Sequence, residues 1–167
     1  MNKKYYRISA ILVLITAFLM MGVMPASARR FTTNFTGTEI LVSVPDPGES
    51  VVIDGKLHIT GMVNIGSAVL DDPRVSGTSR AVINGILDLN DNLSGPMWGN
   101  YYLENEDGSW SGTWTGERTS EGFAYIRLEG QGRGGYQGIS AWWQLERLSP
   151  DPTAPYSVKG YILDPGQ

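Results

Sequence analysis

Residues 108–141 of the chain read GSWSGTWTGERTSEGFAYIRLEGQGRGGYQGISA, and this stretch decides the fold. Tryptophan and glycine alternate with serine, threonine and glutamate from Trp110 to Gly116, so one face is apolar and the other polar. The same alternation returns at Ala124 after a Ser-Glu-Gly turn, and a glycine cluster then leads into a third such segment. The stretch therefore predicts three neighbouring strands joined by tight turns.

Alternation of period two continues outside this stretch, and no segment of helical period is long enough to indicate a helix. The other apolar faces are Ile40, Val42 and Val44; Leu57, Ile59, Gly61 and Val63; Ala81, Ile83, Gly85, Leu87 and Leu89; Met97, Gly99, Tyr101 and Leu103; Ile139, Ala141, Trp143 and Leu145; and Tyr156, Val158, Gly160 and Ile162. This predicts an all-β chain of about eight strands, typical of an up-and-down barrel or a sandwich. We expect a single antiparallel barrel, because eight strands close around an interior that side chains fill or that holds one small ligand.

The first 28 residues have the pattern of a secretory signal peptide. A basic start, residues 3–7, precedes a long apolar run, and residues 25–28 read Pro-Ala-Ser-Ala, which is a small-residue cleavage site. The alternative is an uncleaved anchor, since an apolar run of about 17 residues can just span a bilayer. We expect cleavage after residue 28, a polar extension over 29–37, and a barrel domain over 38–167 in a secreted or periplasmic protein.

Composition excludes several partners and chemistries. Without residues 1–28 the chain has 10 basic and 17 acidic residues, a net charge of −7, which argues against nucleic acid and against a membrane surface as partners. Because the chain has no cysteine, disulfides and a lipid-modified cysteine are excluded. His58 is the only histidine, which excludes a multi-histidine metal site. We expect neither a cofactor nor a metal ion.

Two short motifs look like ligand loops, but their surroundings argue otherwise. Residues 130–135 fit the pattern G-x-G-x-x-G, yet a dinucleotide site needs this turn between a strand and a helix, and here it joins two strands. Residues 88–92 have oxygen ligands at calcium-like spacing, but Leu93 and Gly99 stand where an EF-hand requires glycine and glutamate. We expect a hairpin and a solvated turn.

The otherwise polar face carries several aromatic side chains. The candidate binding residues on that face are Trp98, Tyr102, Tyr125, Arg127, Glu129 and Trp142. Aromatic rings beside amides and charges suit sugar stacking or contact with another protein. The alternatives are cross-strand aromatic pairs that stabilise an exposed sheet, or a subunit interface. No residue stands out as catalytic.

Three motifs carry a resemblance to known proteins: DPRVSG at residues 72–77, GSWSGTW at 108–114, and GRGGYQGI at 132–139. In these motifs the chain resembles the allene oxide cyclase and dirigent-like barrels, and more closely the bacterial exported proteins that share G-x-G-x-Y-x-G-[LI]. The resemblance covers roughly residues 70–163. It implies an eight-stranded antiparallel barrel, often trimeric, with an apolar interior. The plant cyclases act on an unstable fatty-acid epoxide without a covalent nucleophile or a metal, and none of their pocket residues matches a position here.

Three functions fit these observations. The first is a non-enzymatic exported barrel that binds a small apolar molecule or a partner. The second is an isomerase or cyclase of the allene oxide cyclase kind, which requires an interior cavity with polar groups at its floor. The third is a carbohydrate-binding or protein-contact module that uses Trp98, Tyr102 and Trp142. We expect the first.

Overall fold

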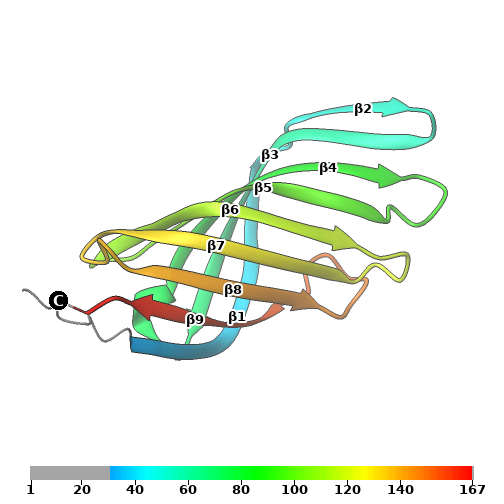
Figure 1. Ribbon diagram of the computed structural model, residues 1–167. Coiled ribbons are helices and arrows are strands. Elements are labelled where there is room, and N and C mark those ends of the chain that lie inside the picture. The colour runs from blue at the N-terminus through cyan, green and yellow to red at the C-terminus, as the bar shows by residue number, and fades with distance from the viewer. Residues whose placement is uncertain (1–30, 167) are drawn as a thin grey trace, which may run out of the picture. The chain divides into compact units, whose positions relative to one another are not determined.

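Nine antiparallel strands make up the described part of the chain, residues 31–166, in a computed structural model (Figure 1). The strands are β1 (Phe31–Asp46), β2 (Glu49–Ile53), β3 (Lys56–Leu70), β4 (Gly77–Asp88), β5 (Gly95–Glu104), β6 (Gly108–Arg118), β7 (Ala124–Gly134), β8 (Ser140–Arg147) and β9 (Tyr156–Asp164). A short 3-10 turn, η1 (Pro73–Val75), joins β3 to β4. From β2 to β9 each strand pairs with the next, so the order is up and down.

The all-β, single-barrel class predicted from the alternation is confirmed. Within residues 31–166 no helix is long and apolar enough to cross a membrane. The predicted signal peptide, residues 1–28, lies outside the described residues.

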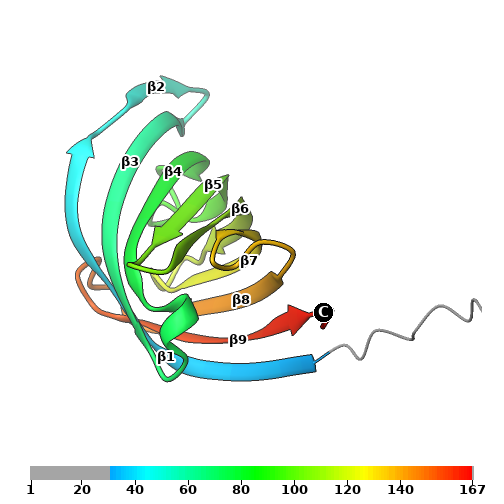
Figure 2. The same cartoon turned by 90° about the vertical axis from the view of Figure 1, so that its left-hand side faces the viewer.

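Strand β1 closes the barrel by pairing along both of its edges. Residues 31–39 pair with β9, and residues 37–46 pair with β3. After Pro47 and Gly48 the chain continues as β2, which pairs with the first residues of β3. Figure 2 shows β1 (blue to cyan) curving away from β9 and rising beside β3. The barrel thus has eight strands, and β2 is a ninth strand that the alternation did not predict.

Aromatic side chains fill one half of the barrel interior. Trp110 and Trp143 meet edge to face with ring centroids 5.6 Å apart, Tyr136 stacks on Trp110 at 5.3 Å, and Phe35 packs on Trp143 at 5.8 Å. All four side chains are buried. The Trp110 indole nitrogen also donates to the backbone oxygen of Arg74 in η1 (2.6 Å). The tryptophans expected on the inner face are therefore core residues, and this half of the barrel is solid.

A β-bulge in β3 changes which of its residues face inward. The register with β4 slips between Ile59 and Met62, and Gly61 at the slip has a φ of 75°. Strict alternation places Val63 on the inner face, but the bulge inserts one extra residue before it, so Val63 points to the outer face, where it is nevertheless buried (8% exposed). The inner positions after the bulge are Met62, Asn64, Gly66, Ala68 and Leu70.

Strand β1 also differs from the sequence-based expectation. It begins at Phe31, so residues 31–37, expected to precede the barrel, form part of its wall. The reason is Phe35, which is 1% exposed and packs over Gly160 of β9. Phe35 points inward, and the next odd-numbered residues share its face. Ile40, the first residue of the apolar face expected here, therefore points outward. All three members of that expected face are exposed: Ile40, Val42 and Val44.

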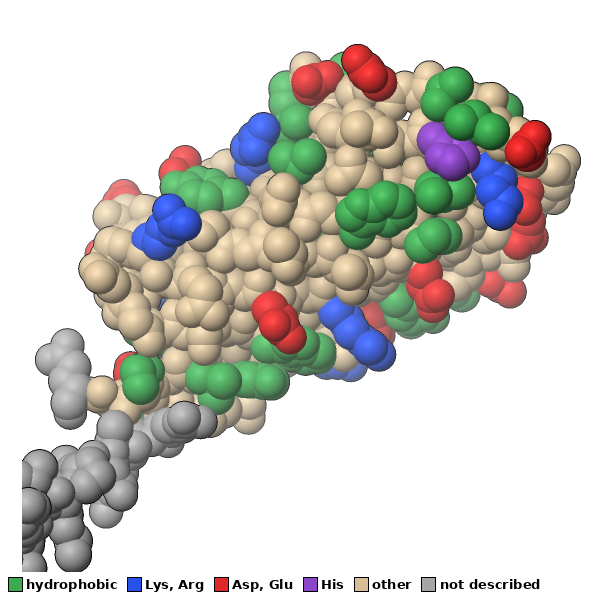
Figure 3. Space-filling view, turned by 45° about the horizontal axis from the view of Figure 1, so that its top comes forward, with side chains coloured by type: hydrophobic (Ala, Val, Ile, Leu, Met, Phe, Trp, Pro, Cys, Tyr) green, Lys and Arg blue, Asp and Glu red, His purple; other side chains and the backbone are tan. Residues whose placement is uncertain are grey.

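Strand β2 exposes apolar side chains. Val51, Val52 and Ile53 are 55%, 58% and 49% exposed, and His58 of β3 lies opposite Val51. Figure 3 shows such side chains (green) gathered around the histidine (purple). Among the described residues β2 pairs with β3 alone, so its other edge is open.

Candidate functional site

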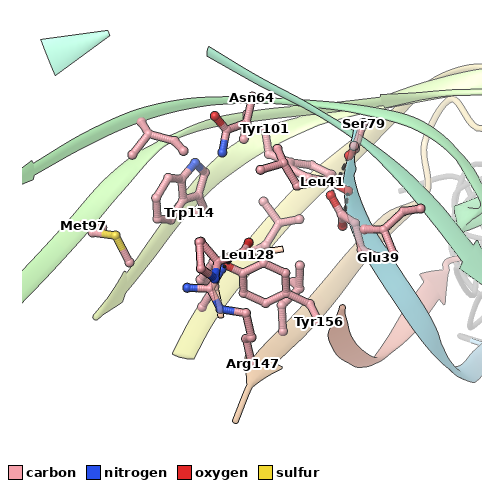
Figure 4. A pocket seen from close by; sticks show the side chains of 17 residues that line it. Glu39, Leu41, Asn64, Ser79, Met97, Tyr101, Trp114, Leu128, Arg147 and Tyr156 are labelled. Atoms are coloured by element: carbon pink, nitrogen blue, oxygen red, sulfur yellow. Dashed lines mark hydrogen bonds between the residues drawn. The ribbon is translucent and has the colours of Figure 1, made fainter. Parts of the chain in front are cut away.

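The second half of the barrel interior contains a cavity of about 110 Å³ (Figure 4). All eight strands of the barrel contribute to its lining, and Asn64 adds a polar group from β3. The apolar lining includes Leu41, Ile83, Met97, Trp114, Ile126, Leu128 and Leu145. Leu41 and Pro152 in its wall are exposed, so the cavity reaches the surface beside β1 and the loop before β9. An engineered apolar cavity of about 150 Å³ in another protein holds benzene. The volume therefore suits one small ring or a short aliphatic chain.

Small inner residues leave this space open. Gly66, Ser79 and Ala81 occupy inner positions of β3 and β4, where the other half of the barrel has large rings. The indole nitrogen of Trp114 donates to the backbone oxygen of Val82 (3.2 Å), which holds the ring in the cavity wall. Residue size along the inner face thus determines which half is packed and which half is hollow.

A half-buried carboxyl group, Glu39 of β1, lies in the cavity wall. Ser79 Oγ donates to one of its oxygens (2.5 Å), and the Tyr101 hydroxyl donates to the other (3.0 Å; dashed in Figure 4). Burial raises the pKa of Glu39 above its usual range, although both hydrogen bonds act in the opposite direction. Burial and the Glu39 charge raise the pKa of Tyr101 well above its ordinary value. The cavity therefore holds a group whose proton is retained more strongly than in water.

Replacement of Glu39 by glutamine tests this raised pKa. Stability from a protonated, buried carboxyl is fully present below the ordinary pKa of glutamate and is lost as the pH rises through the raised pKa. Ser79 and Tyr101 contact Glu39 directly, and the other titratable or charged side chains that line the same cavity are Tyr156 and Arg147. The free energy of unfolding of Glu39→Gln, relative to wild type, is expected to rise between about pH 4 and about pH 8, by about 1.4 kcal/mol for each unit of pKa shift, and the melting temperature should rise with it.

Circular dichroism melts at the two pH values measure this difference. Glu129→Gln makes the same change on the exposed outer face and is the matched control, for which no such rise is expected. A difference for Glu39→Gln that stays constant or falls with pH would contradict the assignment.

Two further polar side chains in the cavity wall have atoms without partners. Asn64 Oδ1 and Arg147 Nε are buried and form no hydrogen bond within residues 31–166. The Arg147 guanidinium lies 5.1 Å from the ring centroid of Tyr156, and its Nη1 donates to the backbone oxygen of Pro152 (3.0 Å). Buried polar atoms are normally paired, so the cavity wall offers one acceptor and one donor to a molecule that enters it.

The structure places the sequence-predicted site residues on the outer face of the barrel. Glu129 and Trp142 are directly opposite each other on β7 and β8, and Trp142 stacks on Tyr161 with ring centroids 5.7 Å apart. Trp98 of β5 and Arg127 of β7 are both directly opposite Thr115 of β6, one on each side of that strand. These two pairs are the predicted site residues that the register brings together.

Of the other two predicted residues, only Tyr102 lies apart from these pairs, and it donates to Glu104 on its own strand (3.1 Å). Tyr125 is opposite Glu146 and shares a shallow groove with Arg127. The groove includes only these two of the six residues, so the role of the six in sugar or protein contact stays a prediction.

Sequence reasoning missed the polar residues of the cavity. Arg147 follows Trp143 and Leu145 on the same face of β8. The alternation could therefore have predicted an arginine among the inward-facing residues. Ser79 likewise precedes Ala81 on the inner face of β4. Glu39 was hidden because the apolar residues after it suggested the opposite face of β1, and Asn64 was hidden by the bulge.

The two motifs that look like ligand loops take these forms. Residues 130–134 of the first motif form the end of β7, and the turn to β8 follows over residues 134–139, so the expected hairpin is confirmed with its turn after most of the motif. At the end of β4, Asp88 Oδ1 accepts from the Asn90 amide (2.8 Å) within a turn. Residues 31–166 contain no group of three side chains placed to hold a metal ion.

Comparisons with protein-family models, with curated proteins and with solved structures found no match. Fold and cavity together define the class of this protein: a closed antiparallel barrel with one packed half and one half that holds a partly polar cavity.

Proposed function

We propose that this protein is an exported barrel that binds a small, mainly apolar molecule in its cavity without changing it chemically. The observation that carries the proposal is the cavity itself, which is enclosed largely by apolar side chains and yet includes unpartnered buried polar atoms. Ligand sites typically combine an apolar lining with a few convergent polar groups that fix orientation. Export is supported by the signal-peptide pattern of residues 1–28.

Tryptophan fluorescence provides the direct test. Trp114 lines the cavity and the other four tryptophans do not, so a bound molecule should change the emission of this residue. A panel of neutral and acidic compounds with one ring or a short chain is expected to change the emission and raise the melting temperature. A panel that changes neither quantity contradicts the proposal.

Filling the cavity is the matched variant for this experiment. Ala81→Phe places a ring in the space that the ligand would occupy, so binding is expected to be lost while the protein stays folded. Arg80→Ala alters the preceding, exposed residue on the outer face and should bind as wild type does. If Ala81→Phe still binds the compounds, the binding site lies outside the barrel interior, which contradicts the proposal.

A second candidate is an isomerase or cyclase of the allene oxide cyclase kind. It is favoured by Glu39, a half-buried carboxyl of raised pKa in a cavity, because such groups serve as general acids or bases. The eight-stranded closed barrel agrees with that family's fold, and a trimer would follow from the same resemblance. Mass spectrometry of the compounds recovered from the binding experiment separates the two functions, since only an enzyme returns an altered compound.

A further inference from the structure

Arg147 is a buried cation in the wall of the cavity. The residue is 7% exposed, and its Nε has no hydrogen-bond partner among the described residues. Its contacts with the Pro152 oxygen and the Tyr156 ring stabilise a positive charge but do not neutralise it. Because an arginine side chain stays protonated in proteins, the cavity wall carries a full positive charge.

No carboxylate within residues 31–166 forms an ion pair with Arg147. Glu39 also lines the cavity, but its two oxygens accept from Ser79 and Tyr101. The Oδ1 of Asp151 on the neighbouring loop accepts from the amide and hydroxyl of Thr153 (2.8 and 2.7 Å), and these bonds, helped by the nearby Arg147 charge, lower the pKa of Asp151. Asp151 is nevertheless exposed and forms no ion pair with Arg147. Burying a charge without a directly paired counter-ion is unfavourable, so the site favours a molecule that brings an anion.

We infer that the ligand of this cavity is a small organic acid whose carboxylate pairs with Arg147. This inference rests on the proposed function, that the cavity binds a ligand. The planar guanidinium group matches a carboxylate in shape as well as charge. The apolar part of the acid lies beside Trp114 and Leu128, and a cavity of about 110 Å³ limits it to one ring or a short chain.

Asn64 fixes the orientation of the acid. Its unpartnered atom is the acceptor Oδ1, which a hydroxyl or N–H group can satisfy and a carboxylate cannot. Figure 4 shows Asn64 and Arg147 on opposite sides of the cavity, with Trp114 and Leu128 between them. The acid group therefore points toward Arg147 and the loop before β9, and the ring points toward β3.

Phenylacetate and 2-phenylethanol test the inference, because they share a ring and a chain length and differ in charge. Calorimetry with wild-type protein is expected to show that the acid binds about ten-fold more tightly than the alcohol, or more. Arg147→Met should reduce the acid-to-alcohol ratio of affinities to about one, and Arg147→Lys should keep part of it. Arg80→Met removes an exposed arginine from the outer face and should keep the wild-type ratio.

The outcomes separate this inference from the proposed function. Equal affinity of wild-type protein for the two compounds overturns the acid assignment and leaves ligand binding in place. Binding of neither compound, nor of any other in the panel, overturns both. If Arg147→Met does not fold, the methyl ester of phenylacetate decides with wild-type protein, because an ester that binds as tightly as the acid overturns the inference.

Discussion

Replacing Trp143 with alanine is expected to lower the free energy of unfolding by about 3 to 5 kcal/mol. The side chain is 2% exposed and contacts the rings of Phe35, Tyr101 and Trp110 in the packed half of the barrel. Its removal leaves a hole between rings that cannot collapse, because each is held by its own strand. For a domain of this size the melting temperature should fall by about 10 °C or more.

The neighbouring residue, Trp142, is the matched control. It points to the outer face, where its main aromatic contact is the stack on Tyr161. Trp142→Ala is expected to lower the free energy of unfolding by about 1 kcal/mol or less. Urea titrations measure the free energy of unfolding of both variants. Equal losses would contradict the assignment of Trp143 to the inner face and Trp142 to the outer face of β8.

The second large effect is expected for Gly112→Ala in β6. An alanine Cβ at this position would overlap the backbone oxygen of Glu129 and crowd the Cα of Gly130 on the paired strand β7. Backbone atoms within a ladder cannot move aside without breaking hydrogen bonds, so a loss of about 3 kcal/mol or more in the free energy of unfolding is expected.

Gly85→Ala in β4 is the corresponding control. Gly85 also lies within a strand, but the nearest atom to an added Cβ is Met97 Cγ at 3.5 Å, which is ordinary contact. Alanine there reduces the freedom of the unfolded chain, so stability should stay constant or rise by about 0.4 to 1 kcal/mol. Chemical denaturation of both variants measures the contrast, and a Gly112→Ala variant as stable as Gly85→Ala would show that β6 and β7 lie further apart than described.

The class of fold could be predicted because one face of most strands is buried. Period-two alternation is strong from β4 to β9, where Trp114 and Leu128 face inward as expected. Turn chemistry supported the same assignment, since the Asp107-Gly108 hairpin and the glycine cluster after β7 join paired strands. In these strands, local pattern and tertiary burial agree.

The candidate cavity could not be predicted in the same way. Its polar members Glu39 and Asn64 lie on β1 and β3, the strands in which parity is interrupted or misleading. The bulge at Gly61 moves every later side chain of β3 to the opposite face. A prediction from strict alternation does not include the extra residue of the bulge. The cavity depends on contacts between strands distant in sequence, such as Glu39 with Ser79. Single-strand patterns do not encode such contacts.

Strand β1 pairs with β9 only as far as Glu39, and from there the chain is held along β3 alone, through β2. Strand segments with one neighbour open locally at lower free energy than segments with two. The wall of the cavity beside Leu41 can therefore fluctuate outward while the ladders of β5, β6 and β7 stay intact. Such opening would widen the mouth that the cavity already has beside β1, so the proposed ligand could enter and leave without unfolding of the barrel.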